Sequence, residues 1–390
     1  MQRLGVSGKM SGPVSEGRRI LVTGLSTYWG GRLAQALEQN PDVEAIVGVD
    51  SQDPTRELAR TEFVRVSNQH ALIRRIVRAA EIDTVIDTRL VVDSAVTTPR
   101  LAHENNVIGT LNILAACSSP DSPVRKLVFK SSAHYYGTGQ DDPAFFTEDM
   151  RRTHAPRTTL KRGIVEAETA VEDFRDKHPE VIVTRMRFCN VLGPDMMTSH
   201  ARLLSLPAVP MIAGFDPRYQ FIHVDDVVGA LEFAVEHDVP GVYNVAPDGV
   251  LALSEVIGIL GKQALPVLPP WGTATAASLL RRAGLNLPPE MLLQLRYGRG
   301  LDNRRLKGAG FTCRFTTRET VQAFAEHLRL KSVLKGVQEP YRYEKEVEDF
   351  LRWSPSVRER EGEFGEHPPR FFPSAPVAES PTQPAQRPRG

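Results

Sequence analysis

The stretch RILVTGLSTYWGGRLAQALEQ, residues 19–39, decides the fold of this chain. An apolar run comes first, and a turn containing Gly24 and Gly30 leads into a helical pattern over residues 31–39. A glycine-containing turn between a strand and a helix lets backbone N–H groups approach a pyrophosphate, and the helix N-terminus adds its positive dipole. The next apolar run, EAIVGVD, ends in Asp50, whose carboxylate is suited to accept hydrogen bonds from a ribose and to repel a 2′-phosphate.

Outward from this unit, short apolar runs alternate with helical patterns. Further runs lie at 62–66, 84–87, 126–130 and 181–185, and helical patterns at 71–80, 107–117 and 159–177. This alternation is typical of βαβ units and predicts a Rossmann-type, doubly wound parallel α/β sheet with helices on both faces. After about Pro194 the runs shorten and Pro and Gly become more frequent, which predicts a smaller C-terminal substrate lobe.

These patterns predict five segments. They are a Gly- and Ser-rich flexible leader (1–18), a dinucleotide-binding domain (19–189), a substrate lobe interleaved with that domain (190–335), a C-terminal extension (336–361) and a Pro-rich tail (362–390). The tail has few aliphatic residues, so it cannot bury enough apolar surface to order itself.

The composition excludes several classes of function. The 390 residues include 48 Lys and Arg against 47 Asp and Glu, so no overall field attracts nucleic acid or a membrane surface. No apolar run reaches the roughly 18 residues of a membrane span, and the N-terminus lacks the apolar core of a secretory signal. The three cysteines (Cys117, Cys189 and Cys313) are widely spaced, which indicates reduced thiols in a cytoplasmic protein and no metal site.

Six motifs follow one another in a recognisable order. They are TGLSTYWGG after the first strand, NNVIGTLNIL from Asn105, KLVFKSSAHYYG from Lys126, RFCNVLGP from Arg187, FIHVDDVVGAL from Phe221 and GVYNVAPDG from Gly241. With these motifs the chain, over about residues 19–330, resembles the extended short-chain dehydrogenase/reductases, in their NAD-dependent epimerase/dehydratase branch. It is most similar there to the UDP-glucose 4-epimerase-like proteins of actinobacteria.

The resemblance implies a cofactor, a substrate class and an acid–base set. It implies that NAD binds the first domain, that a nucleotide-sugar binds under the second lobe, and that the protein forms a homodimer. It also implies a Ser or Thr with a Tyr and a Lys in the spacing YxxxK, because hydride transfer from a sugar carbon requires the loss of its hydroxyl proton. The cofactor-binding positions carried over are Gly24, Thr27, Gly30, Asp50, Arg89 and Asn106.

The acid–base set departs from the family pattern. Ser132 falls at the catalytic Ser/Thr position, but the tyrosine is missing. Anchoring the YxxxK spacing on Glu166 puts Thr158 at the Tyr position and Arg162 at the Lys position. Anchoring it on Glu168 gives two aliphatic residues and fits worse. A threonine hydroxyl is a far weaker acid than a phenol, and an arginine effectively never deprotonates, so we expect slow turnover that restoring Tyr and Lys at these positions would raise.

Other departures leave alternatives open. Thr27 replaces the middle glycine of the turn and adds bulk near a pyrophosphate. Arg89 stands where a small residue would let the cofactor approach, and it either contributes a cation to the phosphates or fills the cleft. Tyr135 is a candidate surrogate acid, and either Arg296 or Arg299 is a candidate for binding a diphosphate.

Two functions are therefore open. The first is an NAD-dependent nucleotide-sugar epimerase/dehydratase-like oxidoreductase with a degenerate acid–base site. The second is a non-catalytic nucleotide-binding regulator or scaffold of the same fold. The persistence of the scaffold motifs favours the first, and Asp50 predicts NAD in preference to NADP.

Overall fold

The computed structural model describes residues 17–66, 70–93, 97–196, 198–268 and 289–334. The chain divides into two units, residues 1–330 and 331–390, and the second is described only over residues 331–334. The predicted leader lies outside the described residues except for Gly17 and Arg18, and Arg18 already belongs to the first strand. The predicted extension (336–361) and tail (362–390) lie outside them entirely.

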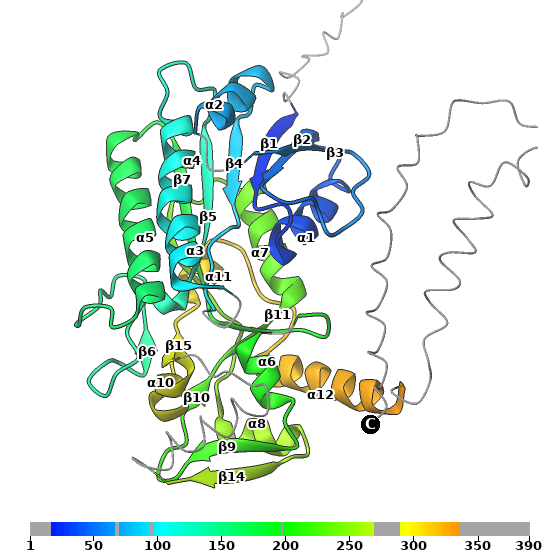
Figure 1. The fold of residues 1–390 in the computed structure, drawn as a ribbon, viewed down its shortest axis with the longest axis vertical. Helices are drawn as coiled ribbons and strands as arrows, with labels where there is room; N and C mark the ends of the chain where they lie inside the picture. Colours follow the sequence, from blue (N-terminus) through cyan, green and yellow to red (C-terminus); the bar gives the residue numbers. More distant parts are fainter. Residues whose placement is uncertain (1–16, 67–69, 94–96, 197, 269–288, 335–390) are drawn as a thin grey trace, which may run out of the picture. The chain divides into compact units, whose positions relative to one another are not determined.

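Seven parallel strands form the central sheet, in the order β12-β7-β5-β4-β1-β2-β3 (Figure 1). They are β1 Arg18–Thr23, β2 Val43–Asp50, β3 Thr61–Arg65, β4 Thr84–Asp87, β5 Lys126–Ser132, β7 Ile182–Phe188 and β12 Gly241–Val245. The sheet grows in one direction from β1 to β3 and in the other from β4 onward, so the switch point lies between β1 and β4. Ligands of open α/β sheets bind at the carboxyl ends of the strands at this point. The doubly wound, Rossmann-type prediction is confirmed.

Helices cover both faces of this sheet. On one face α1 Tyr28–Leu37 packs beside α7 Val224–Glu236. On the other lie α2 His70–Ala79, α4 Gly109–Cys117 and α5 Thr159–Lys177. Successive side chains of β1 point to opposite faces of the sheet. Ile20 and Val22 therefore belong to one apolar cluster, and Leu21 belongs to the other. Burial on both faces is the reason that the central strands read as continuous apolar runs.

Shorter elements dominate in the loop after β5 and in the chain after β7. The loop after β5 contains η2 Ala133–Tyr135 and β6 Phe145–Phe146, and α3 Pro99–His103 and η1 Glu104–Ile108 precede α4. The later strands are β8 Asn190–Leu192, β9 Ala208–Ile212, β10 Arg218–Tyr219, β11 Phe221–His223, β13 Leu251–Ala252, β14 Gln263–Val267 and β15 Gly300–Leu301. The later helices are α6 Ser199–Leu204, α8 Leu253–Ile259, α10 Pro289–Tyr297, α11 Arg304–Gly308 and α12 Thr317–Leu334.

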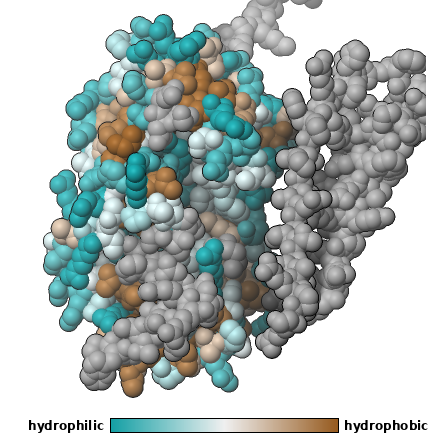
Figure 2. All heavy atoms as spheres, viewed as in Figure 1, coloured by the Kyte–Doolittle hydropathy of each residue, from teal (hydrophilic) through white to brown (hydrophobic). Residues whose placement is uncertain are grey.

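These shorter elements have an apolar cluster of their own, with Leu192, Leu204, Phe221 and Phe324 among its members. They are interleaved with the first domain, since β12 returns to pair with β7 in the central sheet. The surface seen in Figure 2 is mostly hydrophilic with scattered hydrophobic patches. None of the helices in the described ranges is long and apolar enough to cross a bilayer.

Candidate functional site

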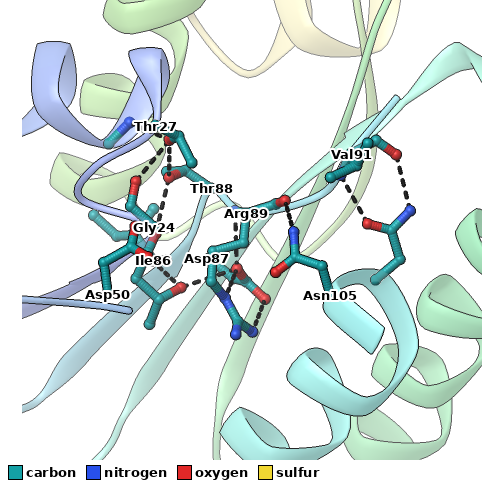
Figure 3. Close-up of polar contacts among 12 residues, drawn as sticks. Gly24, Thr27, Asp50, Ile86, Asp87, Thr88, Arg89, Val91 and Asn105 are labelled. Atoms are coloured by element: carbon teal, nitrogen blue, oxygen red, sulfur yellow. Dashed lines mark hydrogen bonds and ion pairs between the residues drawn. The ribbon is translucent and has the colours of Figure 1, made fainter. Parts of the chain in front are cut away.

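The turn between β1 and α1 brings Gly24, Thr27 and Gly30 together, and Figure 3 shows Gly24 beside Thr27. Gly24 has a φ of 80°, a conformation that L side chains rarely adopt. A Cβ on Gly30 would lie 2.1 Å from the Gly24 carbonyl oxygen, so only glycine lets α1 approach the turn this closely. The Thr27 hydroxyl accepts a hydrogen bond from the Gly30 N–H at 3.1 Å and donates to the Gly24 carbonyl at 2.6 Å. Thr27 is therefore the N-cap of α1. Its hydroxyl already accepts from the Gly30 N–H, which is one of the free N–H groups at the helix start that a phosphate would otherwise accept from.

Asp50 ends β2 beside this turn. Its Oδ2 accepts hydrogen bonds from the Ser26 N–H at 2.9 Å and the Ser26 hydroxyl at 2.6 Å, and its Oδ1 accepts from the Ser51 N–H at 2.6 Å. The Ser51 hydroxyl makes a fourth, longer contact to Oδ1 at 3.4 Å, so each of the roughly four lone-pair positions of the carboxylate already faces a donor. The carboxylate is thus held in the wall of a cavity at the carboxyl edge of the sheet, where a ribose hydroxyl would replace the long contact from Ser51.

Arg89 lies between the turn and α4, as Figure 3 shows. Its Nε and NH2 donate to the carboxylate of Asp87 at 3.1 and 3.3 Å. A Cβ on Gly24 would meet the Arg89 Cγ at 2.5 Å, and one on Gly109 would meet its guanidinium at 2.7 Å. The guanidinium is therefore already neutralised by Asp87 and fills the space between two glycines. Of the two interpretations of Arg89, this geometry favours the one in which it fills the cleft.

Asn106 holds the loop that follows β4. Its side-chain oxygen accepts from the Val91 N–H at 2.7 Å, and its amide nitrogen donates to the Val91 carbonyl at 2.8 Å. The neighbouring Asn105 donates to the Arg89 carbonyl at 2.6 Å. A cavity of about 50 Å³ remains beside Arg89, with Asp50 in its wall. Asn106 thus shapes the cleft through the backbone of this loop.

A second pocket, of about 80 Å³, opens at the carboxyl ends of β5 and β7. Ser132, the last residue of β5, lies in its wall and is 6% exposed. The Ser132 hydroxyl oxygen accepts from the His134 backbone N–H at 3.2 Å. The side chains that line this pocket include Trp29, Asp93, Lys130, His134, Phe188, His200, Gln294 and Arg299. The pocket therefore holds the expected serine among titratable groups that the family pattern does not contain.

Lys130 is the pocket residue that the sequence analysis missed. It lies two residues before Ser132 on β5, so both side chains point to one face of the strand. Its ammonium lies 5.0 Å from the centroid of the Trp29 ring and 5.6 Å from that of the Phe188 ring. Burial lowers the pKa of Lys130 to about 8, while the negative charge of Asp87 opposes the shift. The available signal was a lysine directly after the apolar run LVF of a central strand, two residues before Ser132.

The structure does not bring Thr158 and Arg162 to this pocket. Thr158 is the N-cap of α5, and its hydroxyl accepts from the Lys161 N–H at 3.3 Å. Arg162 lies on the exposed side of the helix. Thr158 lines a different cavity, of about 250 Å³, together with Lys161 and Arg296.

The buried face of α5 carries Leu160, Ile164 and Glu168, which are at most 4% exposed. The carboxylate of Glu168 accepts from the Arg187 Nε at 2.9 Å and from the hydroxyl of Ser131. Residues four apart share one face of a helix, and an acid–base pair has to face the interior where the cofactor lies. Burial therefore favours the spacing anchored on Glu168, which puts Leu160 and Ile164 at the Tyr and Lys positions.

The two tyrosines after Ser132 also point away from the pocket. The guanidinium of Arg187 lies 3.6 Å from the centroid of the Tyr135 ring and stacks on it. The Tyr136 hydroxyl donates to the Asn244 side chain at 2.9 Å, and burial raises the pKa of Tyr136. Neither phenol lines the pocket that contains Ser132.

A family model described as "NAD dependent epimerase/dehydratase family" matches residues 20–246. The chain belongs to this family. It is 34% identical over 335 residues to an uncharacterized protein of Mycobacterium tuberculosis. The aligned region covers 83% of this chain and 86% of that protein. Among members described by name, it is 28% identical over 186 residues to a UDP-glucose 4-epimerase of Yersinia enterocolitica, across 45% of this chain and 54% of that enzyme.

Solved structures share the fold. The UDP-glucose 4-epimerase of Thermotoga maritima, crystallised with UDP-glucose, is 20% identical with a TM-score of 0.61, over 80% of this chain and 99% of that one. At this level of identity the likeness concerns the arrangement of elements and leaves the chemistry of the pocket to be argued from this chain's own residues.

The family's dinucleotide can be tested against the residues of the cleft. The left-handed Gly24, the close approach at Gly30 and the held carboxylate of Asp50 fit a pyrophosphate and an adenosine ribose. Arg89 is the side chain that narrows the space between them. The residues therefore fit NAD, provided that Arg89 turns away from Gly24. No group of three or more His, Cys, Asp or Glu side chains suited to a metal occurs in the parts of the chain that the structure describes.

Proposed function

We propose that the protein is an NAD-dependent nucleotide-sugar oxidoreductase, an epimerase of the UDP-glucose 4-epimerase type with a rearranged acid–base site. The observation that carries this proposal is the meeting of Ser132 and Lys130 in one pocket at the carboxyl edge of the sheet, next to the strand that ends in Asp87. In this proposal, Ser132 and Lys130 of β5 take over the proton transfer that Tyr and Lys on α5 would otherwise perform.

The chain's own residues then have defined roles. Asp50 holds the adenosine ribose, and the backbone N–H groups of the turn at Gly24 hold the pyrophosphate. NAD, when bound, supplies the hydride acceptor. Ser132 hydrogen-bonds the sugar hydroxyl that loses its proton, and the neutral amine of Lys130 takes that proton and later returns it. With a pKa of about 8, Lys130 is partly neutral near pH 7, whereas an ordinary lysine is almost entirely charged.

A second candidate is the non-catalytic nucleotide-binding regulator or scaffold. Two observations favour it: the aliphatic Leu160 and Ile164 on the buried face of α5, and the Asp87–Arg89 pair in the cleft. Both candidates require a dinucleotide or nucleotide ligand, and they differ in whether a sugar hydroxyl is oxidised.

One experiment separates the two. The full chain is titrated calorimetrically with NAD and NADP, and UDP-glucose is followed by chromatography for conversion to UDP-galactose. We expect NAD to bind more tightly than NADP, turnover to be slow, and Lys130→Met to lower turnover by about 100-fold or more while NAD still binds. Arg162→Met, on the exposed side of α5, is the matched control and should keep wild-type turnover.

The outcomes are distinct. NAD binding without turnover in the wild type would support the regulator. Failure to bind either dinucleotide would contradict both candidates, and equal or tighter binding of NADP would contradict the role of Asp50.

A further inference from the structure

The inner end of the pocket at Ser132 contains polar atoms that no described residue satisfies. The Nδ1 of His134 and the Nε2 of Gln294 are both buried without a hydrogen-bond partner among the described residues. Both residues line the pocket, and Gln294 is 1% exposed. Buried polar groups are nearly always hydrogen-bonded, because leaving them unpaired is costly. Two unpaired groups in the wall of one pocket therefore indicate the contact points of a ligand.

A third unpaired group lies just behind them. The hydroxyl of Tyr219 has no partner among the described residues, and its ring packs edge-on against His200 with centroids 5.7 Å apart. The backbone of Tyr219 is bridged to that of Arg299. Of the two unpaired groups in the pocket wall, the amide nitrogen of Gln294 is a donor, and the Nδ1 of His134 donates when it carries the ring proton, so the ligand group that suits them offers acceptors.

Arg299 adds a buried positive charge at the same end. It is 4% exposed and lines the pocket, and the contacts of its NH1 within the described ranges are long, at 3.5 Å to the Tyr136 carbonyl and 3.3 Å to the Thr138 hydroxyl. Burial, reinforced by the like charge of Arg152, lowers the pKa of Arg299 to about 10. The guanidinium stays charged at neutral pH, and no carboxylate of the described residues forms an ion pair with it.

The surroundings are positive as a whole. After burial, the charges of Arg299, Lys161 and Arg152 are among the causes that hold the pKa of His134 well below its usual value. The acid in the wall of the pocket, Asp93, already accepts hydrogen bonds from the N–H and hydroxyl of Ser199 at 2.9 and 2.8 Å. A buried cation without an anion is unfavourable, so this end of the pocket is built for a negatively charged group.

We propose that this end of the pocket binds a carboxylate on the sugar ring, through Arg299 and Gln294 with His134 beside them, and that the substrates are nucleotide-linked uronic acids. The inference rests on the proposed function, which assigns a nucleotide-sugar to this pocket. A guanidinium pairs with a carboxylate through two parallel hydrogen bonds, which a neutral hydroxymethyl group cannot reproduce.

The position of the cluster favours the sugar over the diphosphate. The backbone N–H of His134 donates to the hydroxyl of Ser132, and Gln294 and Arg299 line the same pocket as Ser132, the residue that meets the reacting hydroxyl. The structure also separates the two arginines that the sequence left as alternatives. Arg296 lines the other cavity, with Thr158 and Lys161, whereas Gln294 and Arg299 line the pocket of Ser132.

The test is a calorimetric titration of the full chain, with NAD present, against UDP, UDP-glucose and UDP-glucuronate. We expect the wild type to bind UDP-glucuronate about 10- to 100-fold more tightly than UDP-glucose, the range of a charge-assisted hydrogen-bond pair. Arg299→Met should remove this preference and leave the affinity for UDP unchanged. Arg296→Met is the matched control and should keep the preference. Gln294→Leu removes one unpaired donor without removing a charge and should reduce the preference. This variant replaces Arg299→Met in the test if Arg299→Met does not fold.

Three results would overturn the inference. Equal affinity of the wild type for UDP-glucose and UDP-glucuronate would show that no carboxylate is recognised. Weaker binding of UDP itself by Arg299→Met would assign the guanidinium to the diphosphate. Loss of the preference in Arg296→Met but not in Arg299→Met would move the site to the other cavity. Each of these can occur while NAD and UDP-glucose still bind, so the proposed function would survive them; if neither binds, the proposed function itself fails.

Discussion

Lys130 is buried in a strand where an apolar side chain would be the ordinary choice. The faces of Trp29 and Phe188 receive its ammonium, but ring faces do not replace a full hydration shell, so the charged form is disfavoured. This is the combination of burial and depressed pKa that is found at acid–base sites.

The pH dependence of turnover should report this lysine. A base acts in its neutral form, and the neutral fraction of Lys130 grows as the pH rises through about 8. We therefore expect kcat/KM to rise between about pH 7 and 9 and then level off, as measured with UDP-sugar under saturating NAD. The residual rate of Lys130→Met should lack this rise. A wild-type profile that is flat across this range would exclude Lys130 as the base.

Arg89 limits access of the cofactor, and its removal should improve binding. Because Asp87 is buried and paired with Arg89, the comparison uses Asp87→Asn as background, which avoids leaving an uncompensated charge. Adding Arg89→Ala to this background should tighten NAD binding by about tenfold, which corresponds to roughly 1.4 kcal/mol. Weaker binding on calorimetric titration would show instead that the guanidinium contacts the phosphates.

At the scale of single elements, moving the YxxxK alignment on α5 by two residues changes which side chains stand at the Tyr and Lys positions. Its two candidate faces both carry a glutamate four residues after the presumed lysine position, so spacing alone does not separate them. Glu166 is exposed, whereas Glu168 is fully buried and binds Arg187. The sequence analysis preferred the face of Glu166, which the structure turns to solvent.

Grafting the family pair onto each face tests this conclusion. Thr158→Tyr with Arg162→Lys should leave turnover unchanged, because neither side chain reaches the pocket of Ser132; the sequence alone led us to expect an increase. Leu160→Tyr with Ile164→Lys places polar groups in the core and should lower the free energy of unfolding by a few kcal/mol. Assays of both variants by chromatography and thermal unfolding decide the matter, and higher turnover in the first variant would restore the face of Glu166.

On the scale of the whole molecule, exposed apolar side chains occur along α3, η1 and α4. Leu101, Ile108 and Leu111 are 55%, 42% and 46% exposed, and Ile108 and Leu111, three residues apart at the start of α4, share one side of the helix. The family resemblance predicts a homodimer, and an exposed apolar surface of this kind suits a contact with a second copy.

We accordingly expect the purified protein to be a homodimer and Leu111→Glu to make it monomeric, because a buried unpaired charge opposes association. Leu330→Glu, at a site that is also exposed, is the control and should leave the mass unchanged. Light scattering after size-exclusion chromatography measures the outcome. A monomeric wild type would show that the homodimer prediction is wrong.

The sequence by itself determined the sheet and the phosphate-binding turn. The turn depends on residues close in the chain, because an apolar run followed by Gly24 and Gly30 permits the left-handed turn and the close helix start. The strands pair over long distances in the chain, but their repeated alternation with helical patterns was sufficient to predict a parallel sheet. The order of the remaining motifs was sufficient to identify the family, which is confirmed.

Only the tertiary structure decided the contents of the pocket. Lys130 and Arg299 are 169 positions apart, and Gln294 sits on a helix whose facing side no local pattern reveals. Whether a lysine is an ordinary surface cation or a base with a pKa near 8 depends on what covers it, here Trp29 and Phe188 from distant elements. Burial and unpaired donors arise when these elements pack together. The spacing of residues in the sequence predicts neither of them.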